Sequence, residues 1–154
     1  MNLKLEDPKF HEEIFNEIGQ LLQNFYDCLS DEDAENIDFI YAIASSENGW
    51  HTADVFFQKD NKIILKSELK DNNVDLQVYL MDKSNEMMYN LKQIFTTYNQ
   101  VVPTQIKIIY NAITENLNYK FEYDLMWSET DGLLPKHLKD QWIDELKNSL
   151  LNNN

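Results

Sequence analysis

The sequence predicts a single α+β domain built on an antiparallel sheet of about five strands, with helices at both termini and one in the middle, in the order α-β-β-β-α-β-β-α. Three observations predict this class. Apolar residues recur at helical spacing near both ends and in the middle of the 154-residue chain. Shorter segments between them alternate apolar and polar residues, which is typical of strands with one buried face. Short polar connections favour antiparallel neighbours, with the helices on one side of the sheet or at its ends.

Length and composition indicate one folded domain over residues 1–151, with residues 152–154 as a frayed tail. The chain is 43% hydrophobic and 12% aromatic, which is typical of a folded protein rather than a disordered acidic one. It has only three glycines and three prolines, so we expect no long flexible linker.

The first helix is expected to begin at Asp7-Pro8. An acid can cap the helix there, and proline lacks only an N–H that the first turn leaves free. Its buried stripe consists of apolar residues at helical spacing: Phe10, Ile14, Ile18, Leu21, Leu22, Phe25 and Leu29. The helix should end near Ser30, and the acidic run 31–35 that follows is expected to be a solvated loop.

Three strand-like segments come next. The first alternates at Ile37, Phe39, Tyr41 and Ile43, and residues 45–49 are expected to turn the chain. The second covers 50–58, with Ala53, Val55 and Phe57 on one face and Thr52, Asp54 and Phe56 on the other. A polar turn at 59–62 then leads to a short third strand at 63–65.

The stretch 74–83 fits either a strand or a helix, because its apolar residues match both periods. From Ser84 the helical pattern is firmer, and we favour a helix over 84–99 that starts near residue 74. A hairpin follows, with one strand around 106–110 and the second over 118–127. The chain closes with a helix after Pro135, whose apolar positions are Leu138, Trp142, Ile143, Leu146 and Leu150.

The strand 118–127 is the most informative stretch for function. Three aromatic residues alternate there with charged ones, so one face would be buried and the other would present Glu122 and Asp124. Those two carboxylates would lie ~7 Å apart along the strand. Trp127 is of the residue type that anchors interfaces, and Glu129 and Asp131 follow in an acidic loop. Trp127 and Trp142 also fit a simpler role as core residues between the sheet and the last helix.

The net charge of the chain limits the classes of partner that it can bind directly. The formal net charge is −14, from 27 acids and 13 bases, and every base is a lysine. Such a charge argues against nucleic acid and anionic membranes as direct partners, because both would repel the protein. It is compatible with a basic protein partner, or with solubility alone. Residues 1–36 hold ten acids and two lysines, so the N-terminal helix is a second candidate for an acidic face.

The motifs of metal, phosphate and nucleophile chemistry are missing from the sequence. The three histidines, His11, His51 and His137, fall on different predicted elements and match no metal spacing. Cys28 is alone, which excludes an internal disulfide. We therefore expect no metal and no cofactor. The start of the chain does not have the pattern of a signal peptide, and no apolar run is long enough for a membrane helix, so a cytoplasmic location is expected.

Two alternatives to a protein-binding role stay open. Glu122 and Asp124 can be read as a general acid–base pair of a small acidic enzyme, which would also use a histidine in a concave pocket. The domain can also be the subunit of a homodimer or larger homo-oligomer, which an exposed apolar patch around the hairpin edge would favour.

The elements and motifs also follow a recognisable order. A helix with a long apolar stripe precedes a meander that contains Asp54-Val55-Phe56-Phe57; a second helix and a hairpin ending in Phe121-Glu122-Tyr123-Asp124-Leu125 follow, and then Gly132-Leu133-Leu134-Pro135. This order resembles the YezG-like immunity proteins of bacteria. Members of that family are cytoplasmic antitoxins that bind and neutralise the C-terminal toxin domains, often nucleases, of polymorphic secreted toxins.

The resemblance implies a non-enzymatic protein whose partner is a cognate toxin, and the acidic character of the family matches this sequence. The family has no catalytic residues to transfer. The five contact residues that we expect, Glu122, Asp124, Trp127, Glu129 and Asp131, are therefore our own inference from charge and exposure. They would meet a basic toxin domain, with a nuclease as the expected activity.

Overall fold

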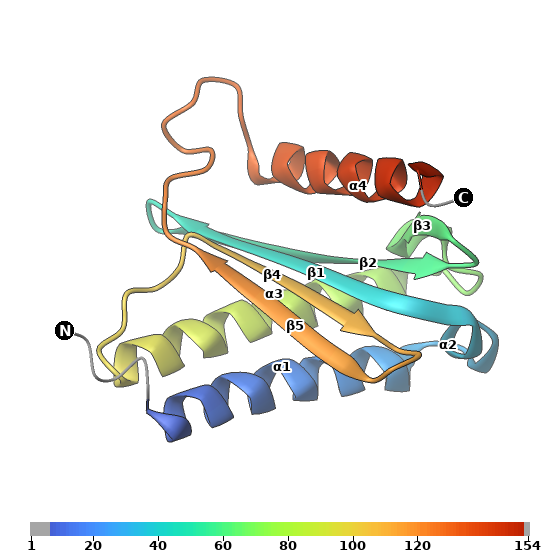
Figure 1. Cartoon of the computed structure of the whole chain (residues 1–154), viewed down its shortest axis with the longest axis horizontal. Coiled ribbons are helices and arrows are strands. Elements are labelled where there is room, and N and C mark those ends of the chain that lie inside the picture. The colour runs from blue at the N-terminus through green and yellow to red at the C-terminus, as the bar shows by residue number, and fades with distance from the viewer. Residues whose placement is uncertain (1–6, 153–154) are drawn as a thin grey trace.

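The computed structural model describes residues 7–152 of the chain. Its elements are α1 (Pro8–Cys28), α2 (Asp31–Asn36), β1 (Ile37–Glu47), β2 (Trp50–Lys59), β3 (Lys62–Leu65), the single 3₁₀ turn η2 (Lys66–Glu68), α3 (Val74–Thr97), β4 (Gln105–Asn111), β5 (Asn116–Glu122) and α4 (Pro135–Asn152) (Figure 1). The predicted α+β class and the order of its main elements are confirmed. Asn152, expected in the frayed tail, is the last residue of α4, and residues 153–154 lie outside the described part.

The sheet has the strand order β3-β2-β1-β4-β5, and each pair of neighbours is antiparallel. Two-residue turns join its first three strands, at Asn48-Gly49 and at Asp60-Asn61. All four of these residues have positive φ angles, which is the geometry of tight hairpin turns and explains why asparagine, aspartate and glycine occupy them. The helix α3 connects the β1–β3 meander to the β4–β5 hairpin.

Helices cover both faces of the sheet. Figure 1 shows α1 and α3 side by side under one face and α4 across the other. The expectation that the helices lie on one side or at the ends is therefore wrong. The central strands are apolar on both faces: Ile40 and Val55 belong to the core shared with α1 and α3, whereas Tyr41 and Phe56 pack with Trp142 of α4. A sheet with two apolar faces needs a cover on each.

The first helix agrees with its prediction. Asp7 caps it by accepting a hydrogen bond from the backbone N–H of Lys9 at 2.9 Å, and Pro8 occupies the first turn. The predicted apolar stripe is buried along its whole length. The ambiguous stretch 74–83 is helical, because α3 begins at Val74. Asn73 fixes that start by accepting a hydrogen bond from the N–H of Leu76 at 2.8 Å.

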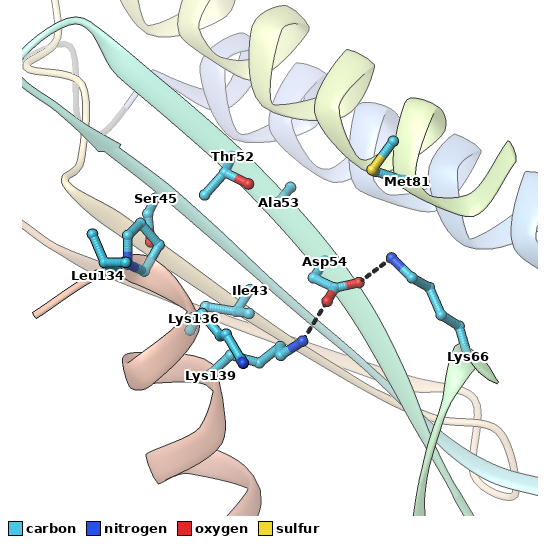
Figure 2. Close-up of a pocket in the computed structure, with 11 residues that line it drawn as sticks. Ile43, Ser45, Thr52, Ala53, Asp54, Lys66, Met81, Leu134, Lys136 and Lys139 are labelled. Atoms are coloured by element: carbon cyan, nitrogen blue, oxygen red, sulfur yellow. Dashed lines mark hydrogen bonds and ion pairs between the residues drawn. The ribbon is translucent and has the colours of Figure 1, made fainter. Parts of the chain in front are cut away.

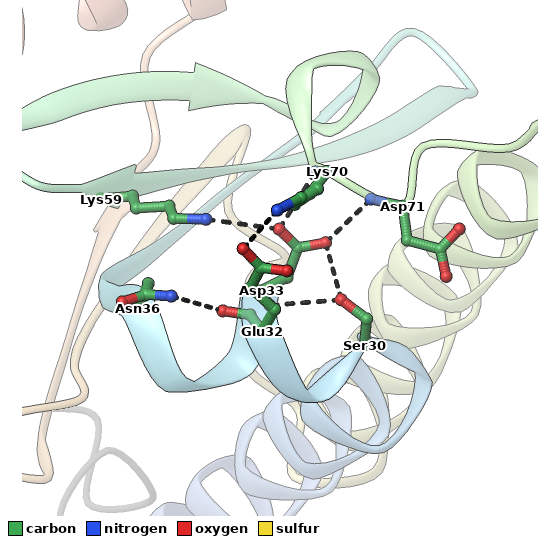
Figure 3. A network of polar contacts seen from close by, with 7 residues as sticks. All are labelled: Ser30, Glu32, Asp33, Asn36, Lys59, Lys70 and Asp71. Atoms are coloured by element: carbon green, nitrogen blue, oxygen red, sulfur yellow. Dashed lines mark hydrogen bonds and ion pairs between the residues drawn. The ribbon is translucent and has the colours of Figure 1, made fainter.

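The acidic run 31–35 is not a solvated loop. It forms α2, and Asp33 within it is completely buried (Figure 3). The Asp33 carboxylate accepts hydrogen bonds from the backbone N–H groups of Lys70 and Asp71, at 3.0 and 3.1 Å, and lies 3.5 Å from the ammonium of Lys59. Burial by itself raises the pKa of Asp33, but these donors and the Ser30 hydroxyl outweigh it and hold the pKa below its usual value.

Two strand ends differ from the prediction. β1 continues to Glu47 instead of turning from residue 45 onward, and β5 ends at Glu122 instead of reaching residue 127. β5 stops there because β4 begins only at Gln105, whose ladder partner is Glu122. Beyond that pair, the Thr104 hydroxyl donates to the carbonyl oxygens of Glu122 and Asp124, at 3.1 and 2.6 Å, and turns the chain away.

Candidate functional site

The structure places the five predicted contact residues at one end of the sheet. Glu122 is the last residue of β5, and the other four lie in the loop 123–134 that leads to α4. Figure 1 shows this loop at the end where β1 turns into β2. The site therefore combines the 123–134 loop with the start of β2, a neighbour that is distant in sequence.

Glu122 and Asp124 do not form the expected strand pair. The carboxylate of Glu122 is half-buried and makes an ion pair with Lys120 at 3.0 Å. Asp124 lies beyond the strand and is exposed. Tyr123, expected on the buried face, is 48% exposed. The alternation predicted over 118–127 thus holds only as far as Glu122, where the ladder ends.

Glu47 positions the loop and was missed by the sequence analysis. Its side chain is buried, and its carboxylate accepts hydrogen bonds from the backbone N–H groups of Met126 and Ser128, at 3.0 and 3.2 Å, and from the Ser128 hydroxyl at 2.7 Å. No lysine lies within ion-pair distance of it in the described part of the chain. The backbone of 126–128 therefore wraps a buried acceptor, which ties the loop to the end of β1.

The signal that could have identified Glu47 is the Asn48-Gly49 pair. This pair is typical of a two-residue hairpin turn and would have placed Glu47 in a strand opposite Trp50. The structure shows that pairing.

The two tryptophans at this end have different environments. Trp127 is half-buried and lines a cavity of about 270 Å³ together with Trp50, Leu134 and Pro135. Its indole N–H is buried and has no hydrogen-bond partner among the described residues. Trp50 is 72% exposed, the most exposed aromatic side chain in the described part. The side chain that can act as an apolar anchor is therefore Trp50, which lines the same cavity as Trp127.

Glu129 and Asp131 are both exposed. They lie in successive turns in which the N–H of Thr130 donates to Trp127 and the N–H of Leu133 donates to Thr130, each at 3.1 Å. Within residues 7–152, neither acid makes an ion pair, and neither does Asp124. These three carboxylates are thus fully available for a partner.

We call this region the loop surface. It consists of three unpaired acids and four exposed apolar side chains: Asp124, Glu129, Asp131, Trp50, Tyr123, Leu125 and Leu134. Aromatic and apolar groups surrounded by charged ones are the composition of a protein–protein interface.

A second cavity, of about 410 Å³, lies beside β2 (Figure 2). Asp54 lines it and makes ion pairs with Lys66 at 2.9 Å and with Lys139 at 2.6 Å. Burial raises the pKa of Asp54, but the hydrogen bonds from Lys139 and Lys66 outweigh it and hold the pKa below its usual value. A carboxyl group held ionised between two ammonium groups is poorly suited to proton transfer near neutral pH.

In the described part of the chain, His51 and His137 make no ion pair with a carboxylate. His137 accepts a hydrogen bond from the N–H of Leu134 at 2.9 Å, which steadies the start of α4. His51 lines the tryptophan cavity, to which no carboxylate contributes. Among the described residues, no three histidine, cysteine, aspartate or glutamate side chains are grouped as a metal site would require.

Comparison with known proteins gives no relative: no family model matches the chain, and neither does a curated protein. Within residues 7–152, the helices are too short or too polar to span a membrane.

Proposed function

We propose that this protein is an immunity protein, a non-enzymatic antitoxin that binds a basic toxin domain through its loop surface and blocks the toxin's activity. A nuclease is the expected partner. An acidic inhibitor can bind where a nuclease binds phosphates, because both present negative charge to the same lysines and arginines.

The observation that carries the proposal is the combination of Trp50 with Asp124, Glu129 and Asp131 at one end of the sheet. A tryptophan that is 72% exposed gains from burial against a partner, and three carboxylates without a cation gain from a basic one. Glu47 holds the loop in place through several hydrogen bonds, so binding requires little further ordering of the backbone.

The enzyme alternative has weaker support. Glu122 is paired with Lys120, and neither it nor Asp124 lines the two cavities described above. His51 lies in a cavity without a carboxylate, and His137 accepts a hydrogen bond from the N–H of Leu134.

The proposal is tested by reversing charge on the loop surface. Tagged protein is used to retain its partner from a lysate of its own cells, and association is then followed by surface plasmon resonance. The double variant Glu129→Lys, Asp131→Lys should associate about 10-fold or more slowly at low salt, and with a weaker dependence on ionic strength, because steering by rim charges acts mainly on the association rate.

A matched control variant has the same net charge as the first double variant but carries the new lysines elsewhere. Asp140 and Asp144 of α4 are exposed and make no ion pair in the described part of the chain, so their double reversal to lysine changes net charge equally on another face. A third variant, Glu12→Lys with Asp27→Lys, changes the exposed side of α1, the other acidic face. Equal slowing by all three variants would refute a local binding site, and slowing only by the α1 variant would move the site to that helix.

A further inference from the structure

The sheet has a half-open edge on β2. The four residues of β3 pair with residues 56–59 of β2, so within residues 7–152 the stretch 50–55 has a strand partner on the β1 side alone. In the register set by the Asn48-Gly49 turn, His51, Ala53 and Val55 direct their backbone groups outward. Unpaired edges of this kind are templates for another strand.

At this edge, side-chain oxygens accept the backbone hydrogen bonds that a neighbouring strand would otherwise accept. The N–H of Ala53 donates to Asn85 Oδ1 of α3 at 3.0 Å, and the N–H of Val55 donates to Asp54 Oδ1 at 2.8 Å. An incoming strand can replace both side-chain acceptors with its own carbonyl groups, because side chains change rotamer far more readily than a sheet rearranges.

The 410 Å³ cavity lies along this open stretch. Ile43 and Ser45 of β1 and Lys139 of α4 line it over the α4 face of the sheet, and Met81 of α3 lines it beside the edge (Figure 2). Thr52, Ala53 and Asp54 of β2 lie between them. The cavity thus covers part of the α4 face and borders the open edge, so a strand added at this edge would lie along one side of it.

The cavity differs in charge from the rest of the molecule. Three of the 13 lysines line it, Lys66, Lys136 and Lys139, against one acid, Asp54. This gives a local charge of +2 in a chain whose net charge is −14. On the α3 side, the apolar side chain that lines the cavity is Met81, which is 41% exposed.

We propose that residues 50–55 of β2 bind an extended peptide segment of another protein, which adds to the sheet as a strand and alternates acidic with apolar side chains. In a strand, successive side chains point to opposite faces. One set would therefore meet the lysines of η2 and α4, and the other would meet Met81 of α3. This surface adjoins the loop surface and shares Trp50 and Leu134 with it, but none of the three loop acids lines the cavity. The proposal holds whether or not the partner of the loop surface is a toxin.

Charge selects this occupant over a second copy of the chain. A twofold pairing of β2 with itself would bring the partner copy's three lysines to the edge that already holds three. A segment with carboxylates instead supplies counter-charges that Asp54 alone does not.

The test uses short peptides as probes. An acetylated peptide of about seven residues, in which glutamate alternates with valine, covers the roughly 20 Å of open edge. Binding is followed by fluorescence anisotropy and by amide shifts in ¹⁵N-labelled protein. We expect saturable binding with shifts at His51, Ala53 and Val55, no binding of a peptide with lysine in place of glutamate, and loss of binding when alternate backbone nitrogens of the probe are methylated.

A pair of lysine variants supplies the protein-side control. Lys136 and Lys147 are both exposed on α4, but only Lys136 lines the cavity. Lys136→Glu should lower the affinity for the glutamate peptide about fivefold or more, whereas Lys147→Glu should change that affinity less than about twofold.

Three outcomes would overturn the proposal. Equal binding of the methylated peptide would exclude strand pairing, and no binding up to millimolar peptide would exclude the site. Concentration-dependent dimerisation that Ala53→Pro abolishes would assign the edge to a second copy. The double variant Glu129→Lys, Asp131→Lys should bind the peptide like the unaltered protein, which separates this test from that of the proposed function.

Discussion

Glu47 is a single buried carboxylate whose role is to hold the loop 123–134 in place. Its carboxylate accepts hydrogen bonds from the backbone of Met126 and Ser128, and its removal would leave those N–H groups without acceptors. We expect Glu47→Ala to lower the free energy of unfolding by about 2–3 kcal/mol, measured by urea denaturation. Glu145→Ala, at an exposed position of α4, should cost less than about 0.5 kcal/mol. Equal costs for the two variants would show that the loop does not depend on Glu47.

Asp33 gives the fold a specific dependence on pH. Its pKa is lower in the folded chain than in the unfolded chain, so its stabilising contribution is fully present above about pH 4–5 and is lost as the pH falls through the folded pKa. Asp33→Asn should cost about 2–4 kcal/mol at neutral pH, because an amide cannot accept from two backbone N–H groups and face Lys59 equally well.

The difference in stability between the unaltered protein and Asp33→Asn should shrink from about pH 4 downward, when the carboxyl becomes protonated. Denaturant titrations over a pH series measure it. Glu35→Gln, an exposed change in the same helix, is the control and should leave the pH profile unchanged. A constant difference between pH 7 and pH 2 would contradict the assigned role of Asp33.

At the scale of elements, α4 depends on a small aromatic cluster. Trp142 packs edge-on against Tyr41 and Phe56, with ring centroids 5.5 and 5.2 Å away. Trp142→Ala should therefore lower the free energy of unfolding by about 3–5 kcal/mol and expose the amides of α4 to hydrogen exchange before those of α1. Leu151→Ala, at a position that is 72% exposed, is the control in the same helix. Loss of protection throughout the molecule at the same rate would show that α4 is not a separate unit.

Periodicity predicted the elements because it reflects one-sided burial. The stripe of α1 is buried as the pattern requires, and so is the predicted inner face of β2 at Ala53, Val55 and Phe57, although Phe56 on the opposite face is buried too. Strand ends were harder to predict, because they depend on where the neighbouring strand begins. β5 stops at Glu122 since Gln105 is its last partner, a fact of pairing that the residues after Glu122 do not encode. The second covered face was missed because only every second residue of β1 was considered, although residues 39–44 form the continuous apolar run that is typical of a strand buried on both faces.

At the scale of the whole molecule, the sequence located the acidic loop but not its setting. Glu129 and Asp131 lie in an exposed loop as expected, whereas Asp124, which was expected on the strand, lies in the same loop. Trp50 joins them only through the hairpin turn and the Glu47 contacts, and both are tertiary features. Trp127, which was expected to be the apolar anchor, is half-buried, and Trp50 is the exposed aromatic side chain.

Two surfaces of opposite charge thus meet along β2. The acidic loop surface lies at its first residue, Trp50, and the lysine-lined edge follows at Thr52–Asp54. A chain with a net charge of −14 would spread acids everywhere if charge served solubility alone. The grouping of lysines at one edge and of acids at one end is what we propose to serve two neighbouring binding surfaces.

We propose that the chain inhibits a toxin by binding it. The most direct measurement is capture of tagged protein with its partner from a lysate of its own cells, followed by mass spectrometry and titration of the partner's activity. We expect to recover a basic toxin domain in a one-to-one complex. The activity of the toxin should fall to zero at an equimolar ratio and return when the complex is dissociated. If nothing is recovered from a lysate that contains the candidate toxin, or if the recovered toxin stays active at saturating inhibitor, the immunity proposal is wrong.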